Sequence, residues 1–511
     1  MASWRFPPSR ALSGVAPLHG EIPRKPFTTT PSSPLLLFTP QKRLYRFRRD
    51  PESPFRVLAR AWSRVVGVRA SPRGDSSQTV HDDSVVSTTA DVCFKTSPFR
   101  ALTRVVFGLL RLTIKPLLAL QWIIGATGSN RKARQAIIGR MKYWFGLDTF
   151  GDRPALPGWE PKKRGSAFGL GSGHGTTGTS GSKQDDHLMP HPEAIRQVVR
   201  EGVLADEIGL DIFAIGEHHR SDYAISAPEI VLATLAGLTN NITLASAVTV
   251  LSSDDPVRVY ERFAELDALS NGRAEVMLGR GSFTESFPLF GYELADYEVL
   301  FEEKVDLFTK LLTEKPVTWS GTTRAALKNQ EVFPKTANGL KASIGVGGSP
   351  QSVIRAAHYG LPVVFAIIGG TPGRFARYTE LYRKACEQFG TTPHPIGMHS
   401  PGFIADTDEE AKELFWPYYK AQHDQIGSER GWPPLHRSQY EGEIAGGSLY
   451  VGAPETVAQK IAKGMTAVGA QRFEMVYTFG PQPADARLRA VELYGTEVVP
   501  RVKELLGATN E

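Results

Sequence analysis

The sequence has few cysteines and no long, uninterrupted apolar run. Only Cys93 and Cys386 occur in 511 residues, which excludes a disulfide scaffold and a cysteine-rich metal site and fits a reducing compartment. The most apolar stretch, residues 101–127, is interrupted by charges such as Arg111 and Lys115. Because charges are costly inside a membrane helix, this stretch favours an amphipathic helix over a membrane span.

Two motifs of common enzyme sites are also missing. The chain has no HxH or HExxH spacing, and adjacent histidines such as His218 and His219 would point to opposite faces of an extended strand. No metal site is therefore predicted. The glycine-rich stretch 164–183 has no strand directly before it and no helix directly after it. It is predicted to be a flexible loop and not a dinucleotide-binding turn.

The charge divides the chain into two unlike parts. Residues 1–140 carry 23 Lys and Arg against 7 Asp and Glu, whereas residues 141–511 carry 36 against 46. The pI of about 9.1 therefore comes from the first part, and no nucleic-acid partner is predicted for the second. The second part is expected to be cytosolic, with organelle targeting or membrane attachment through residues 1–140 as alternatives.

Three regions are expected along the chain. Residues 1–100 are rich in Arg, Ser and Pro, which predicts a largely disordered basic extension. This extension is either a targeting leader such as a transit peptide or translated sequence upstream of the true start. Residues 101–140 are expected to form an apolar and basic helical segment. Residues 141–511 are expected to form the folded domain.

Strand-like and helix-like segments alternate through the folded domain. Apolar runs of strand length are each followed by a segment with helical spacing. The predicted strands lie in residues 141–150, 210–216, 242–251, 274–281, 340–348, 361–370, 394–405 and 471–480. Eight such units predict an α/β fold of the (β/α)₈ TIM-barrel type. The alternative, a doubly wound sheet, would require a glycine-rich phosphate turn after its first strand.

Polar and glycine residues cluster at the predicted C-terminal ends of the strands. In a (β/α)₈ barrel these ends form the mouth that carries the chemistry. The candidates are Asp148, Glu217, His218, Ala247, Val248, Arg280, Gly348, Ser349, Gly369 and Gly370. His218 and His219 are expected to divide their roles, one as a structural group and the other as a proton donor or hydrogen-bonding group in the cavity.

An anion site is expected at the segment that follows the fifth strand. Ser349 is a predicted helix N-cap with Pro350 at the first helical position, and Ser352 adds a hydroxyl. The N–H groups of a helix N-terminus favour an anion, and the guanidinium of Arg280 suits a phosphate. A plain capped helix is the alternative.

Three segments carry a family resemblance. Residues 209–228, 246–293 and 346–362 resemble the bacterial luciferase-like flavin-dependent monooxygenases. The resemblance covers the chain from about Met141 and is closest to an uncharacterised bacterial subgroup. It implies a luciferase-like barrel that binds reduced FMN and uses O₂ to oxidise a small organic substrate.

The resemblance also implies roles for single residues. The phosphate of FMN would be held by Arg280 and by the turn with Gly348, Ser349 and Ser352, with Gly369 and Gly370 closing the site. Ala247 and Val248 would lie under the isoalloxazine ring, joined by a non-proline cis peptide bond, and Asp148 would add to the cofactor site. His218 matches the active-site histidine of the family, with Glu217 as the group that orients it.

One position departs from the family pattern. Gly348 stands where luciferase itself has an acid, so a long-chain aldehyde substrate and light emission are not implied. Because residues 141–511 show no reductase module, a separate flavin reductase is the expected partner, and a homodimer is left open. The alternatives are an oxidoreductase that uses the deazaflavin F420 on the same barrel and a membrane-attached flavin- or ligand-binding protein anchored by residues 101–127.

Overall fold

The computed structural model describes residues 142–159 and 187–507. The expected extension over residues 1–100, the segment 101–140 and the glycine-rich stretch 164–183 lie outside these ranges. No helix within the described ranges is both long enough and apolar enough to cross a membrane.

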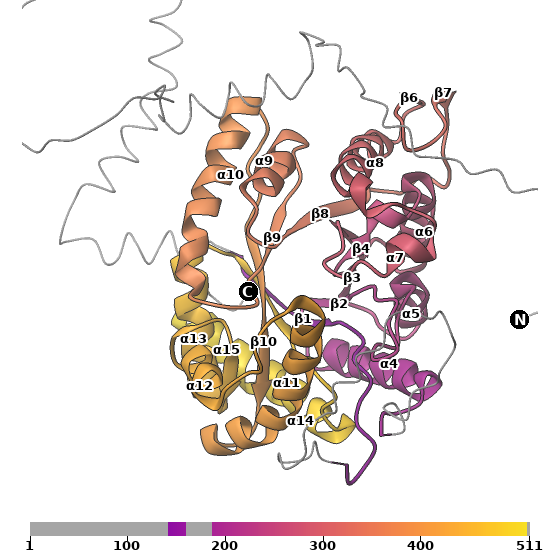
Figure 1. Ribbon diagram of the computed structural model, residues 1–511. Coiled ribbons are helices and arrows are strands. Elements are labelled where there is room, and N and C mark those ends of the chain that lie inside the picture. The colour runs from indigo at the N-terminus through magenta and orange to yellow at the C-terminus, as the bar shows by residue number, and fades with distance from the viewer. Residues whose placement is uncertain (1–141, 160–186, 508–511) are drawn as a thin grey trace, which may run out of the picture. The chain divides into compact units, whose positions relative to one another are not determined.

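Eight parallel strands close into a barrel, as the sequence predicts. Each pairs with the next, and the last strand pairs with the first. Figure 1 shows these strands at the centre, surrounded by helices. In order around the barrel they are β1 (Trp144–Thr149), β2 (Ile212–Ile215), β3 (Thr243–Ser246), β5 (Ala274–Gly279), β8 (Lys341–Val346), β9 (Val363–Ala366), β10 (Gly397–Ile404) and β12 (Arg472–Val476).

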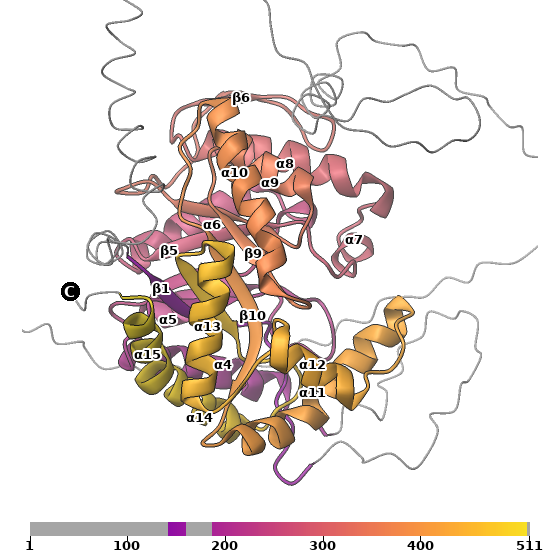
Figure 2. The same cartoon turned by 90° about the vertical axis from the view of Figure 1, so that its left-hand side faces the viewer.

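Helices connect the strands on the outside of the barrel. Figures 1 and 2 both show α9 beside α10 and α13 beside α15. The helices are α4 (His191–Glu207), α5 (Pro228–Ala236), α6 (Pro256–Leu269), α7 (Ser286–Leu289), α8 (Tyr297–Leu311), α9 (Pro350–His358), α10 (Ala376–Phe389), α11 (Asp408–Arg430), α12 (Arg437–Gly446), α13 (Pro454–Val468), α14 (Ala484–Leu493) and α15 (Val499–Leu505).

Three short strands were not expected from the sequence. They are the antiparallel pair β6 (Val317–Trp319) and β7 (Leu327–Gln330), and β11 (Tyr450–Gly452), which pairs with β10. All three lie in connections between barrel strands, and three or four residues are too short to show a period. The strand predicted over residues 242–251 is divided in the structure into β3 and β4 (Thr249–Val250), and β4 pairs with β5.

Alternation along the strands divides the outer core from the barrel interior. In β5, Val276 and Leu278 belong to the large core between strands and helices. Met277 belongs to a smaller interior cluster, and Glu275 and Gly279 share its face of the strand because side chains alternate with a period of two.

The lower interior of the barrel is charged. Arg472 donates two hydrogen bonds to Glu275, at 2.7 and 2.9 Å, and its Nε donates to Glu474 on the same strand. Ser343 donates a further hydrogen bond of 3.0 Å to Glu275. These contacts bridge β5, β8 and β12, so an ionic layer fills a region that branched apolar side chains fill in most barrels of this type.

The interior leaves no room for a side chain at Gly146. A Cβ there would lie 2.7 Å from both the Cβ and the carbonyl oxygen of Ile212 on the neighbouring strand. We expect Gly146→Ala to lower the free energy of unfolding by about 1–3 kcal/mol, the usual cost of overpacking. Denaturant unfolding measures this loss. Gly442→Ala is the matched control, because a Cβ at this exposed position in α12 meets nothing within 4 Å. An unchanged midpoint for Gly146→Ala would contradict the packing described.

Candidate functional site

The residue pair after β3 forms a platform at the barrel mouth. The Ala247–Val248 peptide bond is cis, which confirms the bond expected there. A Cβ at Gly279 would lie 2.8 Å from the Cβ of Val248, and a Cβ at Gly345 would lie 2.9 Å from its Cγ1. Two neighbouring strands therefore carry glycine where the Val248 side chain enters the barrel, and this residue closes the interior from above.

An anion-binding arrangement lies at the start of α9. Ser349 is the N-cap and accepts a hydrogen bond of 3.4 Å from the backbone N–H of Ser352, and Pro350 begins the helix, as predicted. Arg280 approaches the hydroxyl of Ser352 at 3.5 Å and its guanidinium lies 5.2 Å from the ring of Tyr297. The structure therefore brings together three of the residues expected to bind phosphate, Arg280, Ser349 and Ser352.

A carboxylate already balances this positive charge. Glu298 pairs with Arg280 and lies 3.5 Å from the guanidinium of Arg355, and its side chain is 65% exposed. One Nη of Arg355 is buried and has no hydrogen-bond partner among the residues that the structure describes. Because Glu298 is exposed, it can leave the two guanidinium groups at small cost when a phosphate replaces it.

Gly348 in the loop after β8 and the pair Gly369–Gly370 in the loop after β9 differ in their hydrogen bonds. Gly348 has φ +105°, a value that disfavours other residues, and its carbonyl accepts a hydrogen bond of 2.6 Å from Tyr378. The N–H of Gly370, by contrast, donates to both carboxylate oxygens of Glu443, at 3.0 and 3.1 Å. Gly369 accepts a hydrogen bond from Arg374. In this structure the Gly369–Gly370 turn is therefore tied to α12, and its N–H is not free for the phosphate.

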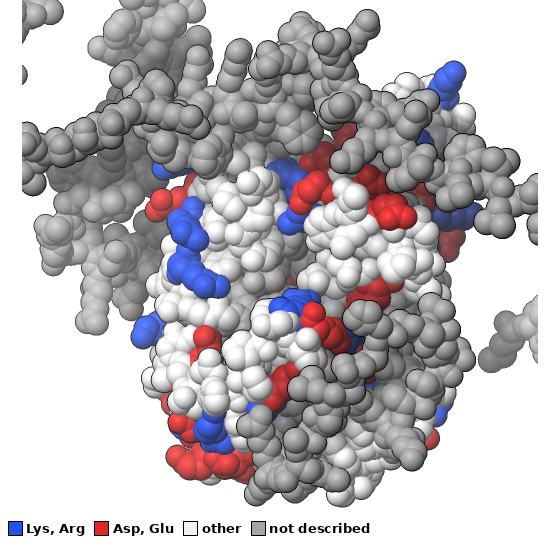
Figure 3. Space-filling model, in the orientation of Figure 1, with Lys and Arg blue, Asp and Glu red and all other residues white. Residues whose placement is uncertain are grey.

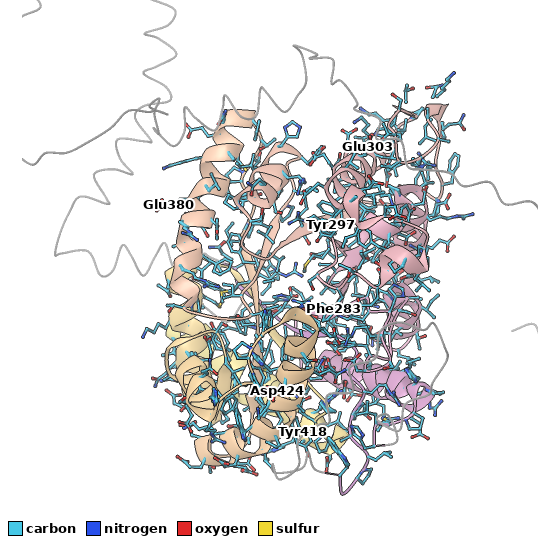
Figure 4. All side chains as sticks on the ribbon, viewed as in Figure 1. Phe283, Tyr297, Glu303, Glu380, Tyr418 and Asp424 are labelled. Carbon is cyan, nitrogen blue, oxygen red and sulfur yellow. The ribbon has the colours of Figure 1, made fainter. Side chains whose placement is uncertain are left out.

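His218 lies in an aromatic pocket directly after β2. Its ring stacks on Tyr223 at 4.3 Å and meets the edges of Phe150 and Phe283 at 5.5 and 5.1 Å. Figure 4 shows Phe283 near the middle of the face viewed. Burial, with a contribution from the positive charge of Arg220, lowers the pKa of His218 to about 3. The imidazole is therefore neutral at physiological pH.

Glu217 does not orient His218, contrary to the expectation. Its Oε1 lies 3.0 Å from Nε2 of His219, and its Oε2 accepts a hydrogen bond of 2.8 Å from the N–H of Val250. The contact joins residues two positions apart, the spacing at which side chains of an extended chain share one side, whereas the adjacent His218 points away. Glu217 thus positions His219 and the segment after the cis bond.

Asp148 contacts a histidine that the sequence did not point to. Its Oδ2 lies 2.6 Å from Nδ1 of His399, the third residue of β10. Both side chains are buried, and the His399 ring meets the edge of Phe150 at 6.3 Å. Phe150 therefore lies between two imidazoles, those of His218 and His399. A histidine in an otherwise apolar strand, on the face that points into the barrel, is the signal that could have revealed it.

An ionic clasp joins three segments at the mouth. Arg220 donates hydrogen bonds to Asp222 at 3.0 Å, to Glu285 at 2.7 Å and to both oxygens of Glu429 at 2.7 Å. Its guanidinium also lies 5.0 Å from the ring of Phe283. The loop after β2, the loop before α7 and the end of α11 are thereby held against the pocket of His218.

The outer face around the mouth has no single charge. Figure 3 shows basic and acidic side chains scattered over a mostly uncharged face, where grey atoms do not cover it. Within residues 142–159 and 187–507, no group of three or more His, Cys, Asp and Glu side chains could hold a metal ion.

Proteins of known activity are similar to this chain in sequence or in fold. A 4-hydroxyprotoasukamycin monooxygenase from Streptomyces nodosus subsp. asukaensis is 26% identical over 317 residues, which are 58% of this chain and 84% of that protein. The oxygenating constituent of 3,6-diketocamphane monooxygenase from Pseudomonas putida, solved with FMN, has a TM-score of 0.53 at 20% identity over 71% of this chain and 99% of its own.

A second cofactor type occurs on the same fold. An F420-dependent secondary alcohol dehydrogenase has a TM-score of 0.51 at 15% identity, over 71% of this chain and 99% of its own. The sequence profile of the luciferase-like monooxygenases matches residues 171–472, more than half of the chain. The chain therefore belongs to the luciferase-like monooxygenase family.

Proposed function

We propose that this protein is an FMN-dependent monooxygenase that acts on a small organic substrate with O₂. The observation that carries the proposal is the pairing of a dibasic phosphate site at α9 with the Val248 platform at the same barrel mouth. Membership of the luciferase-like monooxygenase family supports it.

The described residues fit a phosphorylated flavin. Arg280, Arg355 and the hydroxyl of Ser352 would hold the phosphate, with the first N–H groups of α9 behind them. Ala247 and Val248 would support the flat ring, since the glycines beneath them leave that platform smooth.

Each mouth residue has a separate task in this proposal. Bound reduced FMN supplies electrons to O₂, and the protein binds, orients and excludes water. The rings of Phe150, Tyr223 and Phe283 make the pocket apolar, which keeps water from the reacting atoms. His218 is neutral in this pocket because its pKa is lowered. Its buried Nδ1 has no partner among the described residues, so it can form a hydrogen bond with a bound molecule.

The second candidate is an F420-dependent oxidoreductase, which the likeness to the F420-dependent alcohol dehydrogenase supports. Equilibrium binding of FMN and of F420 to the purified protein, followed by fluorescence, separates the two, and tighter binding of F420 would contradict the FMN proposal. The proposal also includes a separate flavin reductase as partner, a cytosolic location and a homodimer. Attachment to a membrane through residues 101–127 is the alternative to the cytosolic location.

Removal of Arg280 tests the phosphate site. Arg280→Ala deletes a charge-assisted contact of about 1.5–3 kcal/mol, so we expect FMN affinity to fall about tenfold to a hundredfold. Riboflavin lacks the phosphate and should bind the variant and the wild type alike. Titration by flavin fluorescence quenching measures both ligands.

Two variants serve as controls for this test. Arg258→Ala removes a guanidinium that is 74% exposed in α6 and should change neither affinity. Glu298→Gln removes the competing carboxylate and should raise FMN affinity without a change for riboflavin. An equal loss of FMN and riboflavin binding in Arg280→Ala would remove Arg280 from the phosphate site.

A methyl group at Gly279 tests the ring platform. The new Cβ in Gly279→Ala would displace Val248, so we expect FMN and riboflavin affinities to fall by the same factor, because the ring and not the phosphate is affected. Gly237→Ala is the control, since the nearest atom to a Cβ there is 3.7 Å away. Loss of FMN binding alone would mean that Val248 does not lie under the ring.

A further inference from the structure

A buried dyad that the proposed function has not used lies at the base of the mouth. Nδ1 of His399 and Oδ2 of Asp148 are 2.6 Å apart. His399 is 6% exposed and Asp148 is fully buried. Nε2 of His399 and Oδ1 of Asp148 nevertheless have no hydrogen-bond partner among the described residues. Buried polar atoms are rarely left unpaired, so a bound molecule is the natural partner of Nε2.

Charged groups on the neighbouring strands surround this dyad. Glu474 and Arg472 lie on β12, and Glu275 on β5 is paired with Arg472. Three carboxyl groups thus share the interior with one arginine and one histidine. Carboxylates outnumber guanidinium groups here, so the interior favours a positive charge on the imidazole of His399.

The pKa values follow this charge balance. Burial alone would lower the pKa of His399, but its hydrogen bond to Asp148 and the negative charges of Asp148 and Glu474 outweigh burial and raise it. Burial raises the pKa of Asp148 as well. Both changes favour retention of a proton by the dyad.

The two imidazoles around Phe150 therefore differ in protonation. His218 sits among aromatic rings and near Arg220, so it is neutral and cannot act as a cationic acid. His399 sits beside a carboxylate, its Nε2 has no partner among the described residues, and its ring lies 6.3 Å from that of Phe150. Environments that separate the pKa values of two groups in one site also separate their acid and base roles.

We propose that His399, positioned by Asp148, is the proton donor of this site and that its Nε2 donates to an acceptor oxygen of the molecule bound at the barrel mouth. The proposal rests on the proposed function for the identity of that molecule, an oxygen of the substrate or of the flavin ring. In the transfer, the Nε2–H bond breaks and an O–H bond forms on the acceptor. His399 becomes neutral, no electrons move, and water returns the proton after release.

Asp148 is a positioning residue in this scheme. Its carboxylate holds the ring through Nδ1 and stabilises the imidazolium, so its loss should act through the charge of His399. The charged form exists below the raised pKa and is lost as pH rises through that value. Proton donation should therefore fall at alkaline pH.

The test is a pH titration of the histidine side chains by ¹⁵N NMR on the full chain. The His399 signal is identified by its disappearance in His399→Gln or, if that variant does not fold, by the low-field proton of its hydrogen bond to Asp148. We expect His399 of the wild type to keep its proton to a higher pH than a free imidazole does. Asp148→Asn should lower its proton affinity roughly tenfold or more, because an adjacent carboxylate has been removed. The exposed control Asp485→Asn should leave it unchanged.

Ligand additions test the role of Nε2. Sodium formate, a small acceptor-oxygen probe, should shift the Nε2 signal if the atom faces the ligand site. FMN is then added in place of formate, to distinguish the two possible acceptors. A shift of the Nε2 signal with FMN indicates that the acceptor oxygen belongs to the flavin. A shift with formate alone indicates that it belongs to the substrate. A His399 that loses its proton at or below the pH at which a free imidazole does, or an Nε2 signal that neither addition shifts, overturns the proposal. The titration without ligand does not depend on flavin binding, so failure of the proposed function is seen separately.

Discussion

A buried guanidinium inside the barrel constrains much of the structure around it. Arg472 is surrounded by strands, and an unpaired charge there would cost several kcal/mol, so Glu275 and Glu474 must stay in place. These contacts join β5 to β12 across the interior, and Ser343 extends them to β8. The excess of carboxyl groups then sets the environment in which His399 and Asp148 hold their proton. The charge at the base of the barrel and the chemistry at its mouth therefore belong to one electrostatic arrangement.

The barrel could be predicted from the sequence because its strands follow local rules. Each strand is an apolar run with a turn signal behind it, as between Ile212 and Gly216. Eight such units favour the barrel, and the missing glycine-rich turn after the first strand argues against a doubly wound sheet. The helix cap formed by Ser349 and Pro350 was predictable for the same reason, because its hydrogen bond joins residues within one turn, Ser349 and Ser352. The platform at Val248 was predicted from family resemblance and not from any local pattern.

Most of the contacts that the sequence did not predict are long-range. The pairing of Glu217 with His219 is a local exception: the family motif assigned Glu217 to the adjacent His218, whereas residues two apart on an extended chain share one side. The dyad joins Asp148 to a residue 251 positions away, and nothing near either residue signals the other. The same holds for Glu443, which reaches Gly370 from a helix inserted between later strands. Side chains from different βα units meet only when the barrel closes.

The clasp around Arg220 has a consequence for sequence change in this protein. One guanidinium holds the carboxylates of Asp222, Glu285 and Glu429 within a few ångströms of one another. Replacement of the arginine alone would leave three like charges facing each other, so the change adds repulsion to the loss of contacts. The ionic clasp can be replaced by uncharged side chains only if several of these positions change together. Other positions in the loops around the pocket can therefore change one at a time in evolution, whereas Arg220, Asp222, Glu285 and Glu429 are expected to change together.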